Sequence, residues 1–171
     1  MTPPALTEYV CHAKATEYDT EQSKEMEAID TIITSLKEYK DNINEYMEDI
    51  TRSIEDEIKD INVHQQYDLG QDRNGNMITP GYTPFTVSIK RWKGQPTDRV
   101  TLQDTGQFHS SFKIRYDSDS FELYANDWKT ESLVEKYGND IFGLQDDAAI
   151  ELADQVYQPR MIQKLKSVLS L

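Results

Sequence analysis

The first third of the chain has the pattern of one long amphipathic helix. It opens on Thr2-Pro3-Pro4, a helix-start signal, and from residue 21 to 61 it has neither Pro nor Gly. Apolar residues recur there at spacings of three and four, which is typical of one helix face. A helix with one apolar stripe derives most of its stability from packing, and one of this length should project beyond a small domain. We therefore expect the stripe to mediate self-association through Ile29, Leu36, Ile43, Ile50 and Ile54.

The middle of the chain has the pattern of strands and turns. Phe85–Ile89 alternates apolar and polar residues, which predicts a half-buried strand followed by a basic loop. Asn74-Gly75 predicts a hairpin turn. Two further alternating runs, Ser110–Tyr116 and Phe121–Ala125, are joined by four polar residues and predict a β-hairpin.

The last quarter returns to helical spacing. Thr130–Tyr137 predicts a short helix ended by Gly138, and a second amphipathic stretch begins at Asp146-Asp147 and is kinked or restarted at Pro159. The order of elements predicts an α+β fold, with a long N-terminal helix, a small antiparallel sheet in the middle and C-terminal helices packed on the sheet. We expect one domain, 1–171, made of a helical arm (1–62), a β-rich region (63–128) and a C-terminal helical region (129–171).

Charge is distributed unevenly along the 171 residues, whose net charge is −13. Residues 1–62 carry 6 basic and 16 acidic side chains, residues 63–116 carry 7 and 4, and residues 117–171 carry 5 and 11. This balance argues against a dedicated DNA or membrane-surface binder, which needs clustered Lys and Arg. The single cysteine excludes an internal disulfide framework and a thiolate metal cluster. The asymmetry suggests that different surfaces meet different partners, although charged faces are also simply solvated.

The net-positive segment contains a candidate docking site. Lys90, Arg91, Trp92 and Lys93 are consecutive and could contact phosphate or RNA, with Trp92 stacking on a base. In so acidic a chain they more plausibly bind an acidic surface of a protein partner. If Phe85–Ile89 is a strand, Trp92 falls on its opposite face, which favours an interface over the core.

Asp104-Thr105-Gly106 matches the sequence of the aspartic-protease loop, in which two carboxylates share a proton across a dimer. Ile141-Phe142-Gly143 offers the apolar-apolar-Gly motif of the dimeric proteases. However, Gln103 replaces the apolar residue expected before the aspartate. We favour a structural turn in which Asp104 accepts backbone N–H groups and Gly106 supplies a positive φ.

Other candidate chemistry is weak. Asp72, Asn74 and Asn76 have calcium-loop spacing, but Met77 stands where that loop needs Gly, so a hairpin turn is favoured. His64 and His109 are single, without acidic neighbours at ligand spacing, and all three histidines are interpreted as ordinary polar or partly buried residues. We therefore expect no catalytic residue, no metal and no cofactor, and the protein is not expected to be an enzyme.

Several segments resemble the virion morphogenesis, tail-completion and head–tail joining proteins of tailed bacteriophages. Val100–Phe112 resembles their Leu-x-Asp-Thr-Gly stretch followed by an aromatic or aliphatic residue and Ser. A Gln-rich stretch (Gln65-Gln66-Tyr67), a D-x-x-G turn (Asp72–Gly75), a Tyr-Thr…Lys segment (Tyr82–Lys90) and a Y-G…F-G-L segment (Tyr137–Leu144) agree with it. The resemblance spans about residues 60–171 and is closest to the versions in crAss-like gut phages.

The resemblance implies a small α+β subunit of a ring in the neck, between portal and tail. Its partners would be itself, as a homo-oligomer, the portal or adaptor ring, adjacent tail or neck proteins, and the packaged DNA by proximity, with no membrane. It would be assembled in the host cytoplasm and reside in the virion. Two alternatives remain: an acidic interaction or DNA-mimic protein that inhibits a host factor, and a dimeric aspartic protease that uses Asp104.

Overall fold

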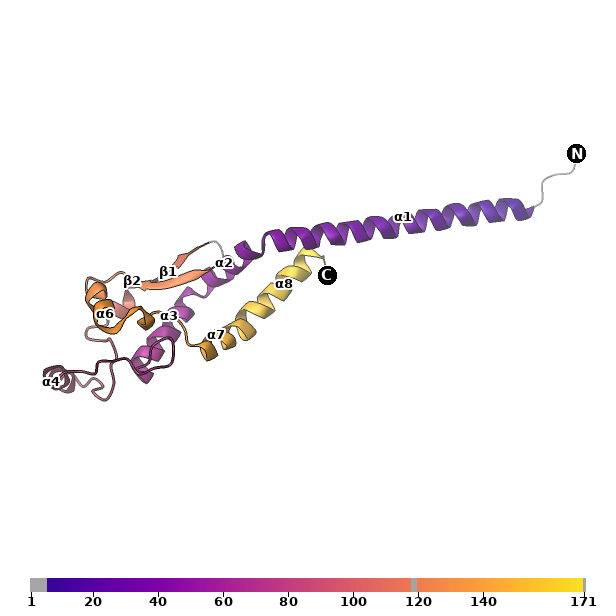
Figure 1. Ribbon diagram of the computed structural model, residues 1–171. Helices are drawn as coiled ribbons and strands as arrows, with labels where there is room; N and C mark the ends of the chain where they lie inside the picture. Colours follow the sequence, from indigo (N-terminus) through magenta and orange to yellow (C-terminus); the bar gives the residue numbers. More distant parts are fainter. Residues whose placement is uncertain (1–5, 118–119, 171) are drawn as a thin grey trace, which may run out of the picture. The chain divides into compact units, whose positions relative to one another are not determined.

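The computed structural model describes residues 6–117 and 120–170, with side chains from residue 20 onward. The chain divides into two compact units. The central unit is Asn44–Met161, and the N-terminal unit combines Met1–Ile43 with Ile162–Leu171. The predicted α+β fold is confirmed: the protein is mostly helical, with a long N-terminal helix, a two-stranded antiparallel sheet in the middle and helices after it (Figure 1).

The N-terminal helical stretch is interrupted rather than continuous. Helix α1 (Leu6–Asp41) is followed by α2 (Ile43–Ser53), α3 (Glu55–His64) and a π-helical turn (Gln65–Leu69). At the first break the Glu38 carbonyl oxygen accepts both the Asn42 backbone N–H over 3.1 Å and the Asn42 side-chain amide over 2.9 Å. The second break is at Ile54. The start signal at Thr2-Pro3-Pro4 lies outside the described residues.

The apolar stripe divides at these breaks into exposed and buried parts. Ile29, Leu36 and Ile43 are exposed, whereas Ile50 and Ile54 are buried in the central unit. Ile54 packs with Ile58 of α3 and Leu152 in a small core cluster. The expectation that Ile50 and Ile54 mediate self-association is therefore wrong, because their surface is already covered by this chain.

The segment predicted as a strand at Phe85–Ile89 is a helix, α4 (Pro84–Trp92). Thr83 caps it, since its hydroxyl oxygen accepts the Thr86 backbone N–H over 3.3 Å. Pro84 occupies the first helical turn, where its missing N–H costs nothing. Local capping chemistry therefore selects the helix although the alternation of apolar residues also fits a strand.

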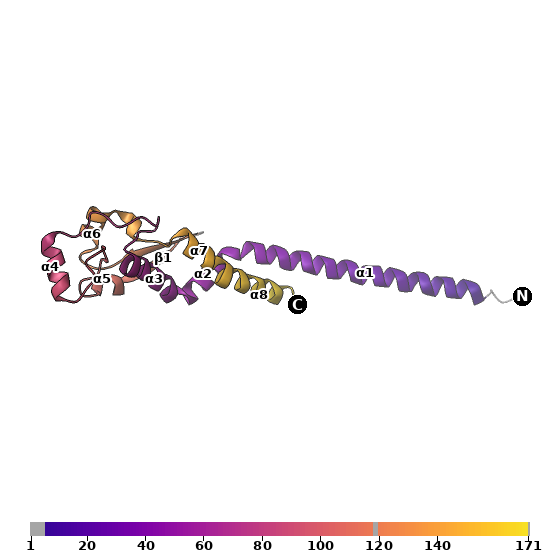
Figure 2. The same cartoon turned by 90° about the horizontal axis from the view of Figure 1, so that it is seen from below.

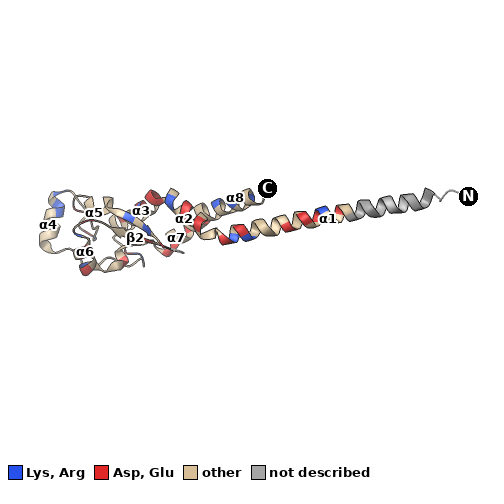
Figure 3. Cartoon of the chain, turned by 90° about the horizontal axis from the view of Figure 1, so that it is seen from above, with Lys and Arg blue, Asp and Glu red and all other residues tan. Residues whose placement is uncertain are grey.

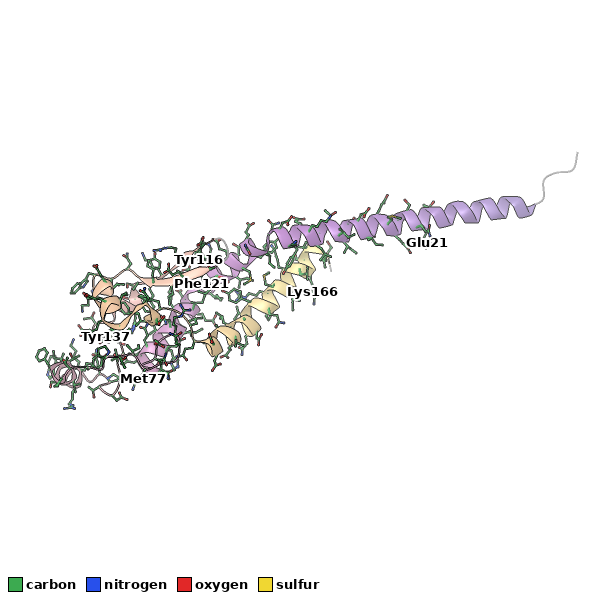
Figure 4. All side chains as sticks on the ribbon, in the orientation of Figure 1. Glu21, Met77, Tyr116, Phe121, Tyr137 and Lys166 are labelled. Atoms are coloured by element: carbon green, nitrogen blue, oxygen red, sulfur yellow. The ribbon has the colours of Figure 1, made fainter. Side chains whose placement is uncertain are left out.

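The predicted β-hairpin is confirmed. Strands β1 (Phe112–Tyr116) and β2 (Phe121–Ala125) pair antiparallel, from Phe112 opposite Ala125 to Tyr116 opposite Phe121 (Figure 4). At the N-terminal end of α3, the Tyr116 hydroxyl donates a hydrogen bond to Glu55 Oε1 over 2.6 Å, which links the hairpin to that helix. Ile114 of β1 packs on both core clusters of the central unit.

The C-terminal helices follow the predicted positions. Helix α6 spans Thr130–Tyr137 and ends at Gly138, which adopts φ +84°. A 3-10 turn (Asn139–Ile141), α7 (Asp146–Leu152), a π-helical turn (Ala153–Tyr157) and α8 (Gln158–Val168) complete the chain. The π-helical turn stands directly before Pro159, in agreement with the predicted restart of the helix.

The main core of the central unit lies between the hairpin, α6 and the loops that precede the hairpin. Three α6 side chains, Leu133, Val134 and Tyr137, pack against it. Its buried members come from segments far apart in the sequence: Ile78, Val100, Leu102, Phe108, Phe112, Leu123, Ala125 and Ile141. Within the described residues no helix is long and apolar enough to cross a membrane.

Candidate functional site

Helix α4 turns its apolar face to solvent. Phe85, Ile89 and Trp92 follow one another at spacings of four and three, which places them on one face. Their side chains are 76%, 38% and 85% exposed, respectively. The residues that α4 turns inward are instead Thr86, Val87 and Lys90. Figure 2 shows this helix at one edge of the central unit. We call Phe85, Ile89 and Trp92 the α4 face.

Lys90 lies on the inward face of α4 and binds within the chain, so it is not available to a partner. Its Nζ donates to Gln103 O over 2.6 Å, and to Thr101 Oγ1 and Gln95 Oε1 over 3.2 Å each. It also lies 4.7 Å from the centroid of the Tyr82 ring. These partners use all three protons of the ammonium group, and the residue is buried. The expectation that Lys90 belongs to a docking site is therefore corrected, since this lysine holds the helix in place.

Asp104 lies between two lysines. Its carboxylate pairs with Lys93 at the end of α4, and with Lys129 before α6 over 3.5 Å. The hydrogen bond from Lys93 holds the pKa of Asp104 below its usual range, and Lys129 adds to this effect. The expectation that this carboxylate accepts backbone N–H groups is corrected, since it accepts hydrogen bonds from both ammonium groups. Two cations favour the charged carboxylate, whereas a protease dyad must keep a shared proton.

The turn expected at Asp104, Thr105 and Gly106 is present. Gly106 adopts φ +89° and precedes the short helix α5 (Gln107–Ser110), which confirms the predicted positive φ. Thr105 Oγ1 accepts the Gln107 backbone N–H over 3.5 Å. The turn therefore sets the start of α5 and holds Asp104 beside the lysines.

Both tryptophans of the chain are exposed beside this group. Trp92 adjoins Lys93, and Trp128, 80% exposed, lies with its ring 5.2 Å from Lys129 Nζ. Asp104 pairs with both lysines. A pocket of about 210 Å³ opens beside it; Asp104 and Lys129 line this pocket together with Tyr82, Leu102, Phe108, Leu133 and Tyr137.

A buried polar network in the central unit joins α3 and the π-helical turn after it to the segment 141–145. Gln66 Nε2 donates to Ile141 O, and Asn62 Nδ2 donates to Gly143 O over 2.7 Å. Gln65 Nε2 donates to Gly143 O over 3.1 Å, and Gln65 Oε1 accepts the Gln145 N–H. Asn62, Gln65 and Gln66 are all buried. The amides thus satisfy the backbone of 141–145, which forms no regular ladder there.

His109 completes this network from α5. Its Nε2 lies 2.9 Å from Gln66 Oε1, an oxygen that can only accept, so Nε2 carries the proton. Burial, and secondarily the charge of Lys90, lowers the pKa of His109 to about 4. The imidazole is therefore neutral near pH 7 and acts as a structural donor.

The turn at Asp72–Asn76 packs against the same segment. Asp72 Oδ1 accepts the backbone N–H groups of Asn74 and Asn76 over 2.9 Å each, which accounts for the spacing of these residues without a cation. The Arg73 N–H donates to Asp140 O over 2.9 Å. Across the described part of the chain, no three His, Cys, Asp or Glu side chains are grouped to hold a metal ion.

The structure therefore retains Arg91, Trp92 and Lys93 as candidate docking residues, buries Lys90, and adds Phe85 and Ile89. The signal for the added residues was present as Thr83-Pro84, a helix start. Comparison of the chain with protein-family models, curated proteins and solved structures found no match.

Proposed function

We propose that this protein is a structural subunit of a tailed-phage virion, part of a ring in the head–tail connector or neck that joins the portal to the tail and lines the DNA channel. The observation that carries the proposal is the α4 face. Phe85, Ile89 and Trp92 are large apolar side chains that lie exposed to water on one helix face. Aromatic anchors with basic neighbours are typical of protein interfaces. A connector subunit acts by binding its neighbours through such a surface.

The segments that resemble phage neck proteins also meet in space, which supports the proposal. Gln66, His109 and Ile141 come from three of those segments and are joined by hydrogen bonds of 2.9 Å or less. The turn at Asp72 contacts the same place through Arg73 and Asp140. A shared pattern of this kind is what a common fold would produce.

Charge supports a role beside DNA without binding to it. Residues 20–41 of α1 carry six acidic against three basic side chains (Figure 3). In a connector, acidic residues that face the lumen would repel the duplex and let it slide. Arg91, Trp92 and Lys93 would meanwhile dock on an acidic neighbour, which could belong to the same ring, the portal or adaptor ring, or a tail protein. The function requires no cofactor.

The proposed function is tested by measuring whether the protein is present in the virion. Particles purified from the phage that encodes it should contain this chain in several copies, measured by quantitative mass spectrometry against the major capsid protein. Phage that carries Phe85→Ala with Trp92→Ala should yield filled heads without tails, whereas the control Met77→Ala, which removes an apolar side chain that is 51% exposed elsewhere, should yield normal particles.

Other outcomes would contradict the proposal. A chain that is absent from particles and is recovered with a host nuclease or repressor would be an acidic inhibitor. Peptide-bond cleavage that is lost in Asp104→Asn while the fold is retained would indicate the protease.

A further inference from the structure

A closed ring needs two different surfaces on each subunit that fit one another, because a surface that fits only itself is used up in a dimer. This requirement rests on the proposed function. Among the described residues, the α4 face is one apolar surface that the rest of the central unit leaves exposed. A second lies on α1, where Met26, Ile29 and Ile33 are spaced by three and four residues.

The α1 residues, like those of α4, are exposed. Met26, Ile29 and Ile33 are 63%, 56% and 43% exposed, respectively, and we call them the α1 stripe. Both surfaces are short rows of large side chains on a helix, the geometry in which one helix packs its ridges into the grooves of another.

The charges beside the two surfaces are opposite. Residues 21–33 carry Glu21, Glu25, Glu27 and Asp30 against the single basic Lys24. The end of α4 carries Arg91 and Lys93, and although Lys93 pairs with Asp104, Lys129 pairs with the same carboxylate, so this group of side chains is net positive. Two α1 stripes would bring like charges together, whereas an α1 stripe against an α4 face pairs acidic with basic residues.

We propose that the α4 face of one copy binds the α1 stripe of the next copy of this chain. Trp92 is the buried anchor of the contact, and Arg91 pairs with the acidic residues beside the stripe, while Lys93 and Lys129, both paired with Asp104, add positive charge beside it. Because the two surfaces differ, each copy donates one and receives one, so the contact repeats from subunit to subunit until the ring closes. The acidic neighbour of the docking residues is thus a second copy.

The test uses three double variants of the full chain. Phe85→Ala with Trp92→Ala breaks the α4 face, and Ile29→Ala with Ile33→Ala breaks the α1 stripe while keeping a strong helix former. The control, Met77→Ala with Ile150→Ala, removes two exposed apolar side chains outside both surfaces. Circular dichroism establishes that each variant is folded, and analytical ultracentrifugation over a concentration series measures association.

Wild type and control should associate, and their association should weaken as salt is raised. Each face variant alone should sediment as a monomer, with association weakened about 30-fold or more, as for the loss of a hot-spot aromatic. The decisive sample is a mixture of the two face variants. It retains one intact α4 face and one intact α1 stripe per pair, so it should form a 1:1 dimer and nothing larger.

Three results would overturn the inference: a monomeric wild type at every concentration, a mixture that stays monomeric, or an α4 variant that associates like wild type, which would mean that α1 stripes pair with one another. The proposed function fails separately, if the chain is absent from particles. A chain present in many copies per particle whose variants show no complementation would leave the connector role intact and assign the α4 face to a different protein.

Discussion

His109 makes the pH dependence of unfolding a test of the buried polar network. The ring donates through Nε2 to Gln66 and packs against Phe108 and Phe112, with ring centroids 5.6 and 5.5 Å away. Burial and the nearby charge of Lys90 lower its pKa from 6.5 to about 4. Protonation in the folded state would place a second N–H and a positive charge in this site.

The lowered pKa of His109 fixes the sign and the size of the change in unfolding free energy with pH. Between pH 6.5 and 4 the unfolded chain binds a proton at His109 and the folded chain does not, so the free energy of unfolding falls as the pH falls. The slope approaches about 1.4 kcal/mol per pH unit, and the total loss is about 3 kcal/mol. Above pH 6.5 both states are neutral at this residue and it contributes no slope.

Urea unfolding of wild type, His109→Gln and His64→Gln across this pH window measures the effect, with near-ultraviolet circular dichroism as the readout of packing. Glutamine keeps a donor for Gln66 but cannot titrate, so His109→Gln should lose the extra slope. His64→Gln is the matched control for replacing a histidine elsewhere, because the His64 side chain is 61% exposed and pairs with Asp68 over 2.7 Å rather than with Gln66. A wild-type slope in His109→Gln would refute the reasoning.

Three further substitutions test the other features. Trp92→Ala should leave the melting temperature unchanged and weaken association by about 2 kcal/mol, measured by ultracentrifugation; a much lower melting temperature would place the indole in the core. Gly106→Val should cost about 1–3 kcal/mol in urea, since φ is +89° there, whereas Gly81→Val, with equal space and no positive φ, should cost less. Gln66→Leu should cost about 3 kcal/mol because it leaves the His109 N–H and the Ile141 carbonyl underbonded, and Gln155→Leu, on an exposed helix surface, should cost under about 0.5 kcal/mol.

Elements with strong local signals could be predicted from the sequence. The hairpin at Phe112–Ala125 follows from alternation on both sides of a polar turn, and α6 follows from its spacing and from Gly138. The turn at Gly106 could also be predicted, because it needs a residue that adopts a positive φ. In each case the chain within about ten residues contains the physical cause.

Helix α4 could not be predicted by the same reasoning. Phe85, Val87 and Ile89 alternate as in a strand, while Phe85, Ile89 and Trp92 have helical spacing, so the two patterns overlap. A search for an apolar face to bury favours the strand, since the helix leaves its apolar face in water. The deciding interactions are the Thr83 cap and the burial of Lys90, and the lysine's partners lie 5 to 13 residues further along the chain.

The resemblance and the docking surface rest on different kinds of residue. Gln66 and His109 lie in the segments that resemble phage proteins, and the structure places them in a buried network, where each hydrogen bond left unmade costs about 1–3 kcal/mol. Most replacements of such residues would therefore destabilise the fold. Phe85 and Trp92 are 76% and 85% exposed and make no such contribution to the fold, so only a contact with another molecule would bury them. The surface through which the chain assembles is therefore expected among the apolar side chains that the fold leaves uncovered, such as Phe85 and Trp92.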